Sequence, residues 1–329
     1  FDGQNIEYGI ICSVLASIGY SGSLVFYNSF LPEIATYDRY DRISARGFSY
    51  GYIGSVILLV FNLLMIEKPG WFGLEAGTLP AKISFLTVGL WWIGFSQITF
   101  KYLPAGVSKN RVLKEYIFKG YREVRIVLKS LEELPSLKKF LLSFFFYNTG
   151  VQTVMYLAAS FGDKELKLSA GKLIGTILII QIVAILGSYL FARLSEARGN
   201  KFSINTMVII WVLICVSAYF VGNENEFYAL AFAVGLVMGG IQALSRATYA
   251  KLIPSNTIDH ASYFSFYDVT YNVSIVLGTL SYGLIEHWTG SMRNSTLALG
   301  GFFLIGLVFL LKVRIPKSEK EAYTISEAA

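Results

Sequence analysis

The side chains of this chain that could bind a small molecule are amides and phenols set inside long apolar runs. Asn148 and Gln152 are four positions apart, so on a helix both project from one face, next to Tyr147. Amides and phenols donate and accept hydrogen bonds, which suits the carboxylate and ammonium groups of a zwitterion. Within a membrane they must pair with one another or face a wet cavity. Two interpretations stay open: a substrate-binding site, or hydrogen bonds between helices. The other candidates for substrate binding are Tyr27, Asn28, Gln181 and Gln242.

Charge is scarce inside the apolar runs, and the candidates for coupling or gating lie at two neighbouring helix ends. Asp268 is the single acidic residue within the predicted spans, and Arg246 follows the end of the preceding span at a similar depth. In one interpretation the two form an ion pair that locks the helix ends together. In the other, Asp268 is a carboxylate that binds a proton or the substrate.

The residue types needed for a metal site or a hydrolytic site are nearly missing. The chain has two histidines and two cysteines, with no HExxH motif and no Ser, His and Asp set at membrane depth. Cys12 and Cys215 both fall in apolar runs, which favours a packing role. We therefore expect no metal, no cofactor and no enzymatic activity.

The elements that position these residues are expected to be transmembrane helices. The chain is 54% hydrophobic and 15% charged, with a mean hydropathy of +0.53, whereas soluble domains carry about 25% charged residues. Because a lipid-exposed segment must satisfy its own backbone groups, runs of this length predict helices. We predict an all-α integral membrane protein with nine transmembrane helices. The predicted spans are 8–31, 47–66, 83–100, 140–162, 173–192, 202–223, 227–245, 261–285 and 294–311.

A basic stretch at 101–139 separates the first three spans from the last six. It holds ten Lys and Arg against four Glu, so it cannot lie in a bilayer core. Apolar residues recur in it at steps of four and three, which predicts an amphipathic helix along the membrane surface; they are Ile117, Tyr121, Val124, Leu128 and Leu131. The predicted organisation is 1–100 as an incomplete N-terminal half, 101–139 as a basic cytoplasmic loop, 140–313 as a six-helix C-terminal half and 314–329 as a cytoplasmic tail.

The distribution of Lys and Arg over the loops predicts the orientation. If the stretch 101–139 is cytoplasmic, 22 of the 28 basic residues lie on the cytoplasmic side, in agreement with the positive-inside rule. The excess of Lys and Arg is therefore explained by loops that hold the protein in one orientation in the membrane, and no nucleic-acid partner is expected.

Short motifs in the chain resemble those of a transporter superfamily. Residues 192–201 are similar to the cytoplasmic signature of major facilitator transporters; Leu194, Ser195, Gly199 and Lys201 match, and Glu196 replaces an Asp. The segments FYNSFLPEI (26–34), RISARGF (42–48), GYIGS (51–55) and ALSRATY (243–249) resemble the vacuole-effluxer-like family of this superfamily.

This resemblance implies a bundle of six plus six helices. The nine spans would be helices four to twelve, and helices one to three are not among them. In this superfamily helices one, four, seven and ten line the cavity, and three of these correspond to 8–31, 140–162 and 227–245. The resemblance adds four residues of the motif to the gating candidates Arg246 and Asp268, namely Glu196, Arg198, Gly199 and Lys201.

The expected function is secondary active transport of a small polar metabolite, with amino acids and efflux as the implied class, by alternating access. We expect a monomer with a proton as the candidate coupling ion, in the cell membrane of a bacterium or the vacuolar membrane of a fungus. The alternative is a non-transporting membrane protein or an inactive fragment, because a bundle without its first three helices cannot close a cavity.

The orientation can be tested by labelling single cysteines in whole cells with a membrane-impermeant thiol reagent. With Cys12 and Cys215 replaced by Ser, Lys167→Cys should be labelled and Lys109→Cys should not, because the two positions lie on opposite sides. Labelling of Lys109→Cys alone would reverse the predicted topology.

Overall fold

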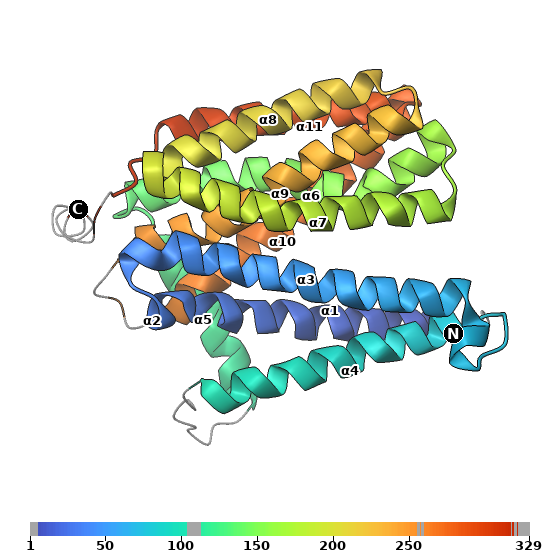
Figure 1. The fold of residues 1–329 in the computed structure, drawn as a ribbon. Helices are drawn as coiled ribbons and strands as arrows, with labels where there is room; N and C mark the ends of the chain where they lie inside the picture. The colour runs from blue at the N-terminus through green and yellow to red at the C-terminus, as the bar shows by residue number, and fades with distance from the viewer. Residues whose placement is uncertain are drawn as a thin grey trace. The chain divides into compact units, whose positions relative to one another are not determined.

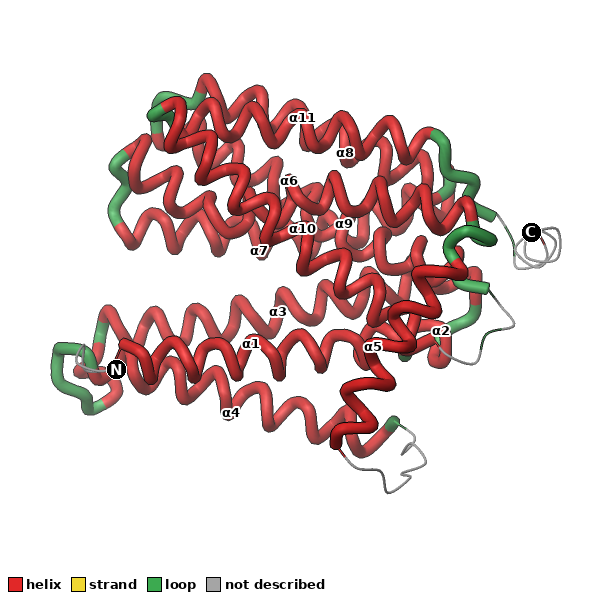
Figure 2. The backbone as a smooth tube through the Cα atoms, turned by 180° about the vertical axis from the view of Figure 1, so that it is seen from behind, coloured by secondary structure: helices red, strands yellow, loops and turns green. Residues whose placement is uncertain are grey.

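The fold in the described part of the chain is helical throughout. The computed structural model describes residues 6–103, 113–254, 257, 260–316, 318 and 321, and the side chains of 113–119 lie outside this description. In these ranges helices are joined by turns and loops, and no strand is present (Figure 2). The helices are labelled in Figure 1; they are α1 (Ile6–Ser29), α2 (Leu31–Ile34), α3 (Tyr40–Glu67), α4 (Leu79–Tyr102), α5 (Leu113–Ser130), α6 (Pro135–Leu166), α7 (Ala170–Arg198), α8 (Asn200–Phe220), α9 (Glu224–Leu252), α10 (His260–Thr289) and α11 (Met292–Leu311).

Seven helical segments in the described ranges are long and apolar enough to cross a membrane; they are Ile6–Ile34, Tyr37–Glu67, Leu79–Tyr102, Ala170–Arg198, Asn200–Phe220, Glu224–Leu252 and Met292–Leu311. The other two predicted spans fall on α6 and α10, which have 32 and 30 residues. Both exceed the roughly 20 residues that a bilayer requires, but they are less apolar, since they carry most of the mid-span polar candidates. The count of nine spans stays a prediction.

The chain divides into two compact units, and the division runs through α1 and α3. One unit is Phe1–Gly19 with Ile53–Lys119, and the other is Tyr20–Tyr52 with Gly120–Ala329. This differs from the predicted organisation, which placed all of 1–100 in one half. The physical reason is that residues 28–52 make hydrogen bonds with α7, α8 and α9, described below. This division by compactness does not test the predicted boundaries, which stay a prediction.

In the smaller unit, α3 contacts α4 and the 3-10 turn that precedes α4. The hydroxyl of Thr87 donates to the side-chain oxygen of Asn62 at 2.8 Å. The rings of Phe61 and Phe72 meet edge to face, with centroids 5.5 Å apart. Pro69 begins the 3-10 turn Pro69–Phe72, where its missing N–H leaves no bond unmade.

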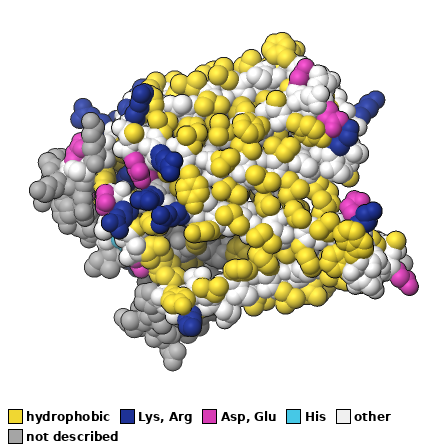
Figure 3. All heavy atoms as spheres, in the orientation of Figure 1, with side chains coloured by type: hydrophobic (Ala, Val, Ile, Leu, Met, Phe, Trp, Pro, Cys, Tyr) yellow, Lys and Arg dark blue, Asp and Glu magenta, His cyan; other side chains and the backbone are white. Residues whose placement is uncertain are grey.

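The larger unit holds the core of the protein. In it α7 packs on α9, α11 packs on α6 and α8, and α10 packs on α6. The indole of Trp211 stacks on Phe303 at 5.3 Å, and both side chains are fully buried. Figure 3 shows apolar side chains along the helices and Lys and Arg gathered mainly at their ends, as expected for segments that cross a bilayer.

The stretch 101–139 contains two helix segments. The helix α5 covers Leu113–Ser130, and α6 already begins at Pro135, five residues before the predicted span. Pro135 occupies a first-turn position of α6, where proline fits without the loss of a hydrogen bond. In α5 the side chain of Val127 is buried, whereas Tyr121 and Leu128 are exposed. Its location along a membrane surface stays a prediction.

Glycines bring α7 and α9 into backbone contact. A Cβ atom on Gly187 would overlap the carbonyl oxygen of Leu236, and one on Gly239 would overlap that of Ala184. Small residues at such positions let helix backbones approach closely, which is the main source of attraction between helices in a membrane.

This packing predicts different outcomes for two glycine substitutions in the same helix. Gly187→Ala should lower the free energy of unfolding by about 1–3 kcal/mol, because the added methyl group overpacks the α7–α9 contact. Gly175→Ala, where nothing lies within 4 Å, should leave the melting temperature unchanged or raise it, since alanine favours a helix. Equal melting temperatures for both variants in detergent would contradict the assigned contact.

Candidate functional site

Polar residues of five helices meet at one end of the larger unit. At this end α1, α7 and α9 finish while α3 and α8 begin. It carries Arg42, Arg193, Arg198 and Lys201, so we refer to it as the basic end. Two buried hydrogen-bond networks lie here, one around Arg246 and one around Asp41.

Arg246 in α9 joins the end of α1 to the start of α3. Its side chain is buried; Nε donates to the Ser44 hydroxyl at 2.9 Å and Nη2 to the Ser44 carbonyl at 3.0 Å. Nη1 donates to the side-chain oxygen of Asn28 at 3.3 Å. The guanidinium also lies 4.8 Å from the Tyr27 ring and 4.7 Å from the Phe48 ring. Hydrogen bonds and two aromatic faces thus replace the water that the buried cation has lost.

Asp41, at the start of α3, is the centre of the second network. Its carboxylate is buried and accepts from Ser195 Oγ at 2.7 Å, from Asn200 Nδ2 at 2.7 Å and from Lys251 Nζ at 2.8 Å. Lys251 Nζ also donates to Asn200 Oδ1 at 2.9 Å, and Asn200 donates to Thr248 at 3.0 Å. A buried ion pair is tolerated when its remaining donors and acceptors are bonded, and this one meets that condition.

The sequence analysis missed Asp41, which the structure bonds to Ser195 in the motif itself and to Asn200 and Lys251. Glu196 and Arg198 are exposed, with the Arg198 guanidinium 5.2 Å from the Phe202 ring. The signal that could have found Asp41 is the mixed-charge run at 38–42, which was counted only for its cations. The gating role of Glu196 and Arg198 stays a prediction.

Two other residues of the motif shape the turn between α7 and α8. Gly199 has φ of +86°, a conformation that side chains with a Cβ disfavour. Lys201 Nζ donates to the carbonyl oxygens of Leu311 and Val313, at 2.7 and 2.8 Å, at the C-terminal end of α11. A cation there satisfies carbonyls that a helix end leaves free and interacts favourably with the helix dipole.

The predicted pair in α6 is brought together as its spacing indicates. Gln152 Nε2 donates to Asn148 Oδ1 at 3.3 Å, and Asn148 Nδ2 donates to Ser274 Oγ in α10 at 2.6 Å. The phenol of Tyr147 forms a 2.7 Å hydrogen bond with the Ser245 hydroxyl in α9. All three side chains are buried. In this arrangement the polar groups of α6 bond to neighbouring helices, so a ligand would bind by exchanging these bonds.

The glutamines of α7 and α9 are placed differently. The Oε1 atom of Gln242 accepts a 2.6 Å hydrogen bond from the Tyr52 hydroxyl. The Oε1 atom of Gln181 is buried and has no hydrogen-bond partner among the described residues. A buried amide oxygen without a partner is destabilising, which marks Gln181 as a group that a ligand or water could satisfy.

The predicted ion pair between Asp268 and Arg246 is not formed. Arg246 bonds to Ser44 and Asn28 instead, and no ion pair of Asp268 occurs among the described residues. The carboxylate of Asp268 accepts from Asn272 Nδ2, one turn further along α10, at 3.0 Å. The interpretation of Asp268 as a structural lock was therefore wrong, because α1 and α3 supply closer partners for the arginine.

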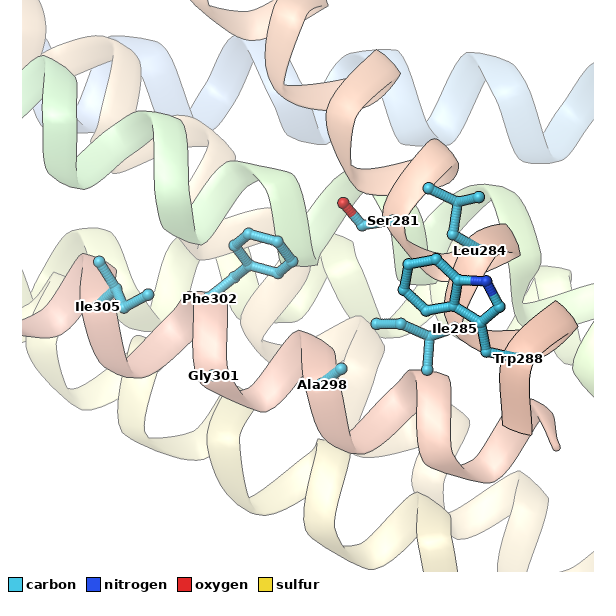
Figure 4. A pocket seen from close by; sticks show the side chains of 8 residues that line it. All are labelled: Ser281, Leu284, Ile285, Trp288, Ala298, Gly301, Phe302 and Ile305. Carbon is cyan, nitrogen blue, oxygen red and sulfur yellow. The ribbon is translucent and has the colours of Figure 1, made fainter. Parts of the chain in front are cut away.

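A pocket of about 360 Å³ between α10 and α11 differs in character from these networks. Figure 4 shows it lined by Leu284, Trp288, Phe302 and Ile305, with the hydroxyl of Ser281 at one side. Its apolar lining does not suit a polar metabolite.

Comparison with solved structures defines the fold class. The crystal structure of the Escherichia coli fucose:proton symporter FucP matches with a TM-score of 0.62 at 14% identity, covering 89% of this chain and 73% of that chain. A second structure of FucP is described as a major facilitator superfamily transporter in the outward conformation. It matches with a TM-score of 0.63 at 14% identity, covering 89% of this chain and 72% of that chain. The chain therefore has the major facilitator fold.

The chain belongs to the family described as "Vacuole effluxer Atg22 like", whose model matches residues 1–323. The MFS-type transporter YxiO of Bacillus subtilis, itself named as uncharacterized, is 30% identical over 90% of this chain and 68% of its own length. Autophagy-related protein 22 of Kluyveromyces lactis is 27% identical over 86% of this chain and 60% of its own length. Autophagy-related protein 22 of Cryptococcus neoformans (strain B-3501A) is 27% identical over 87% of this chain and 55% of its own length. The chain thus spans between about half and two thirds of these relatives. As a member of this family with several apolar helices, it is a multi-pass membrane protein.

The Asp41 network predicts unequal effects for two neighbouring aspartates. Asp41→Asn should lower the free energy of unfolding by about 3–5 kcal/mol, because it leaves the Lys251 ammonium buried without a counter-charge. Asp38→Asn is the matched control, since its pair with Arg39 is exposed at 3.8 Å, and should not change the melting temperature. If the two variants have the same melting temperature, the Asp41 pair is not buried as described.

Proposed function

We propose that the protein is a secondary active transporter that moves a small polar metabolite out of a compartment, with amino acids as the substrate class. The observation that carries the proposal is the family match over residues 1–323, whose description names an effluxer, on a major facilitator fold. The proposal includes the assignment of the nine predicted spans to helices four to twelve of a six-plus-six bundle. It also includes a monomeric state, and a proton as the coupling ion.

Alternating access is supported by the nature of the contacts at the basic end. Asp41 and Ser44 in α3 and Asn28 in α1 bond to residues of α7, α8 and α9 through side chains. Such polar contacts can be exchanged for water when helix ends separate, whereas an interlocked apolar core cannot. We assign the basic end to the cytoplasmic side and the two networks to the closed state of a gate there.

Substrate binding is assigned to the polar candidates nearer the middle of the helices. Asn148, Gln152 and Tyr147 project from α6, and Gln181 and Gln242 from α7 and α9. Asn28 accepts a hydrogen bond from Arg246 and the Tyr27 ring lies against its guanidinium, so we reassign both residues from substrate contact to the gate. The unbonded oxygen of Gln181 and the exchangeable pair in α6 support a role in binding.

A cross-link across the gate tests transport and gating in one experiment. The Ser44 hydroxyl donates to the Ala243 carbonyl at 2.7 Å, so the two residues are neighbours in α3 and α9, and the double variant Ser44→Cys with Ala243→Cys places one thiol on each side of the gate. The full-length protein, with Cys12 and Cys215 replaced by Ser, would be reconstituted in liposomes loaded with a mixture of the twenty amino acids. Counterflow of the radiolabelled mixture is measured before and after oxidation.

We expect the oxidised protein to lose about 90% or more of its counterflow, since the gate can no longer open, and a reductant to restore it. The reduced double variant is the matched control. Full counterflow in the cross-linked protein would reject the gate, and the absence of counterflow for every amino acid in the unmodified protein would reject the substrate class.

A further inference from the structure

The pocket of about 360 Å³ between α10 and α11 lies apart from the residues assigned to the gate and to substrate binding. Each of the two helices lines it with residues spaced i, i+3, i+4 and i+7, a spacing that places them on one face of a helix. They are Ser281, Leu284, Ile285 and Trp288 of α10, and Ala298, Gly301, Phe302 and Ile305 of α11. The pocket is therefore a groove between facing stripes of two neighbouring helices (Figure 4).

Small residues leave room for the groove, and aromatic rings bound it. Ala298 and Gly301 line it from α11, and a Cβ atom on Gly301 would meet nothing within 4 Å. The indole of Trp288 and the ring of Phe302 come from the two opposite helices, as Figure 4 shows. No lining residue is charged, and the Ser281 hydroxyl and the indole N–H are the polar side-chain groups of the lining. Because water needs two or more polar partners to stay in such a space, this lining suits a hydrocarbon.

The groove opens on an apolar surface of the larger unit. Leu284, Trp288 and Ile305 line it and are 41%, 75% and 43% exposed. Exposed apolar side chains continue along α11 outside the groove, at Leu304 and Val308. Since α11 is apolar enough to cross a membrane, a continuous row of this kind is typical of a surface that meets lipid. The groove is thus part of that surface.

The depth of the groove corresponds to one leaflet of a bilayer. It begins where α10 ends and α11 starts, which is the end opposite the Lys201 contact with α11. At a rise of about 1.5 Å per residue, Ile305 lies about 20 Å from the start of α11, and half of a hydrocarbon core is about 15 Å thick. Trp288 lies in the last turn of α10, at the interfacial level where tryptophan is frequent. The groove therefore runs from the interface to about the middle of the bilayer.

The size and charge of the groove restrict what can fill it. A helix of another protein is about 10 Å across, which is too wide to enter a space of this volume. At the same end of the two helices, Glu286 pairs with Lys164 and Arg293 with Glu165, both at 3.0 Å. Because these charges are already paired, they contribute no net charge that could select a headgroup. What the groove can recognise is therefore a narrow, flexible hydrocarbon chain.

We propose that the groove between α10 and α11 binds one acyl chain of a phospholipid, from the leaflet opposite the basic end, with the headgroup at the level of Trp288. The chain lies against Gly301 and between the rings of Trp288 and Phe302. There it gains contacts on several sides, whereas a chain at an ordinary helix surface is contacted on one side. The bound phospholipid is therefore expected to stay with the protein when other lipids exchange. This inference does not depend on the proposed transport function.

Lipid retention by the full-length protein tests the proposal. The probe is palmitoyl-oleoyl phosphatidylcholine: the protein is reconstituted in vesicles of this lipid, extracted in a mild detergent and analysed by native mass spectrometry. We expect a single phospholipid to stay bound to the unmodified protein under collisional activation that removes the others, because its chain is held on several sides.

Two glycine substitutions assign the retained lipid to the groove. Gly301→Leu places a side chain in the open space and should lower the retained phospholipid by about fivefold or more, since chain and side chain cannot share that space. Gly283→Leu in α10 is the matched control: a Cβ atom there also meets nothing within 4 Å, and the position is exposed but outside the groove. It should leave retention unchanged. If Gly301→Leu fails to fold, Ala298→Leu tests the same space from the preceding turn of α11.

Photocross-linking in the same vesicles locates the chain. A phosphatidylcholine with a photoreactive group at the end of one chain should label Ile305 about threefold more than Leu304, because a chain in the groove is held beside Ile305. Leu304 is the reference, since it lies at the same depth and is exposed on α11 outside the groove.

The outcomes separate the groove from the surrounding surface. Equal labelling of Ile305 and Leu304 would make the groove ordinary lipid-facing surface, and overturns the proposal. Labelling of Leu304 alone would show that another segment of the full-length protein, or a second copy, covers the groove, and also overturns it. Retention that neither Gly301→Leu nor Ala298→Leu lowers, or retention of a free fatty acid in place of a phospholipid, has the same consequence.

Discussion

The constraint on which the larger unit depends is that buried charges at the basic end must be satisfied without water. Asp41 and Lys251 neutralise one another, and the further donors and acceptors of that network come from α7, α8 and α9, namely Ser195, Asn200 and Thr248. Among the described residues Arg246 forms no ion pair, and it is held by Ser44, Asn28 and two aromatic rings. Removal of one partner would leave the other as a buried charge without compensation. These contacts therefore fix where the ends of α1, α3, α7, α8 and α9 lie within the unit.

The same contacts account for the unequal division of the chain into compact units. Residues 20–52 carry polar side chains that find partners in α7, α8 and α9. The remainder of α3 meets α4 and the turn before it, where Asn62 accepts from Thr87 and the Phe61 ring meets Phe72. In a membrane the apolar contacts gain little over contacts with lipid, so hydrogen bonds and close glycine packing select the partner helix.

The helical class and the register of the α6 pair could be predicted from the sequence, because both follow from local periodicity. Asn148 and Gln152 share a face through spacing alone, and the structure joins them. The partner of Arg246 could not be predicted in this way. Both Asp268 and Ser44 lie near the same end of their helices as Arg246. Which of them meets Arg246 depends on which helix packs against that part of α9. Asp41 was missed for a related reason: a charged loop residue looks solvated until the helices that bury it are placed.

The distribution of polarity within the larger unit agrees with a gate at one end and a binding region further in. The charged side chains of the networks at the basic end are bonded to groups of the protein, so in this state they hold helices together. Further along, α6 and α10 carry enough polar groups to fall outside the set of clearly apolar helices. The Asp268 carboxylate in α10 forms no ion pair among the described residues, and the Gln181 oxygen in α7 has no hydrogen-bond partner among them. Unsatisfied groups are destabilising in an isolated protein, and a ligand that satisfies them gains binding energy from that deficit. A transporter needs both conditions in one bundle, since a site that the protein itself saturates has no free energy left with which to bind its substrate.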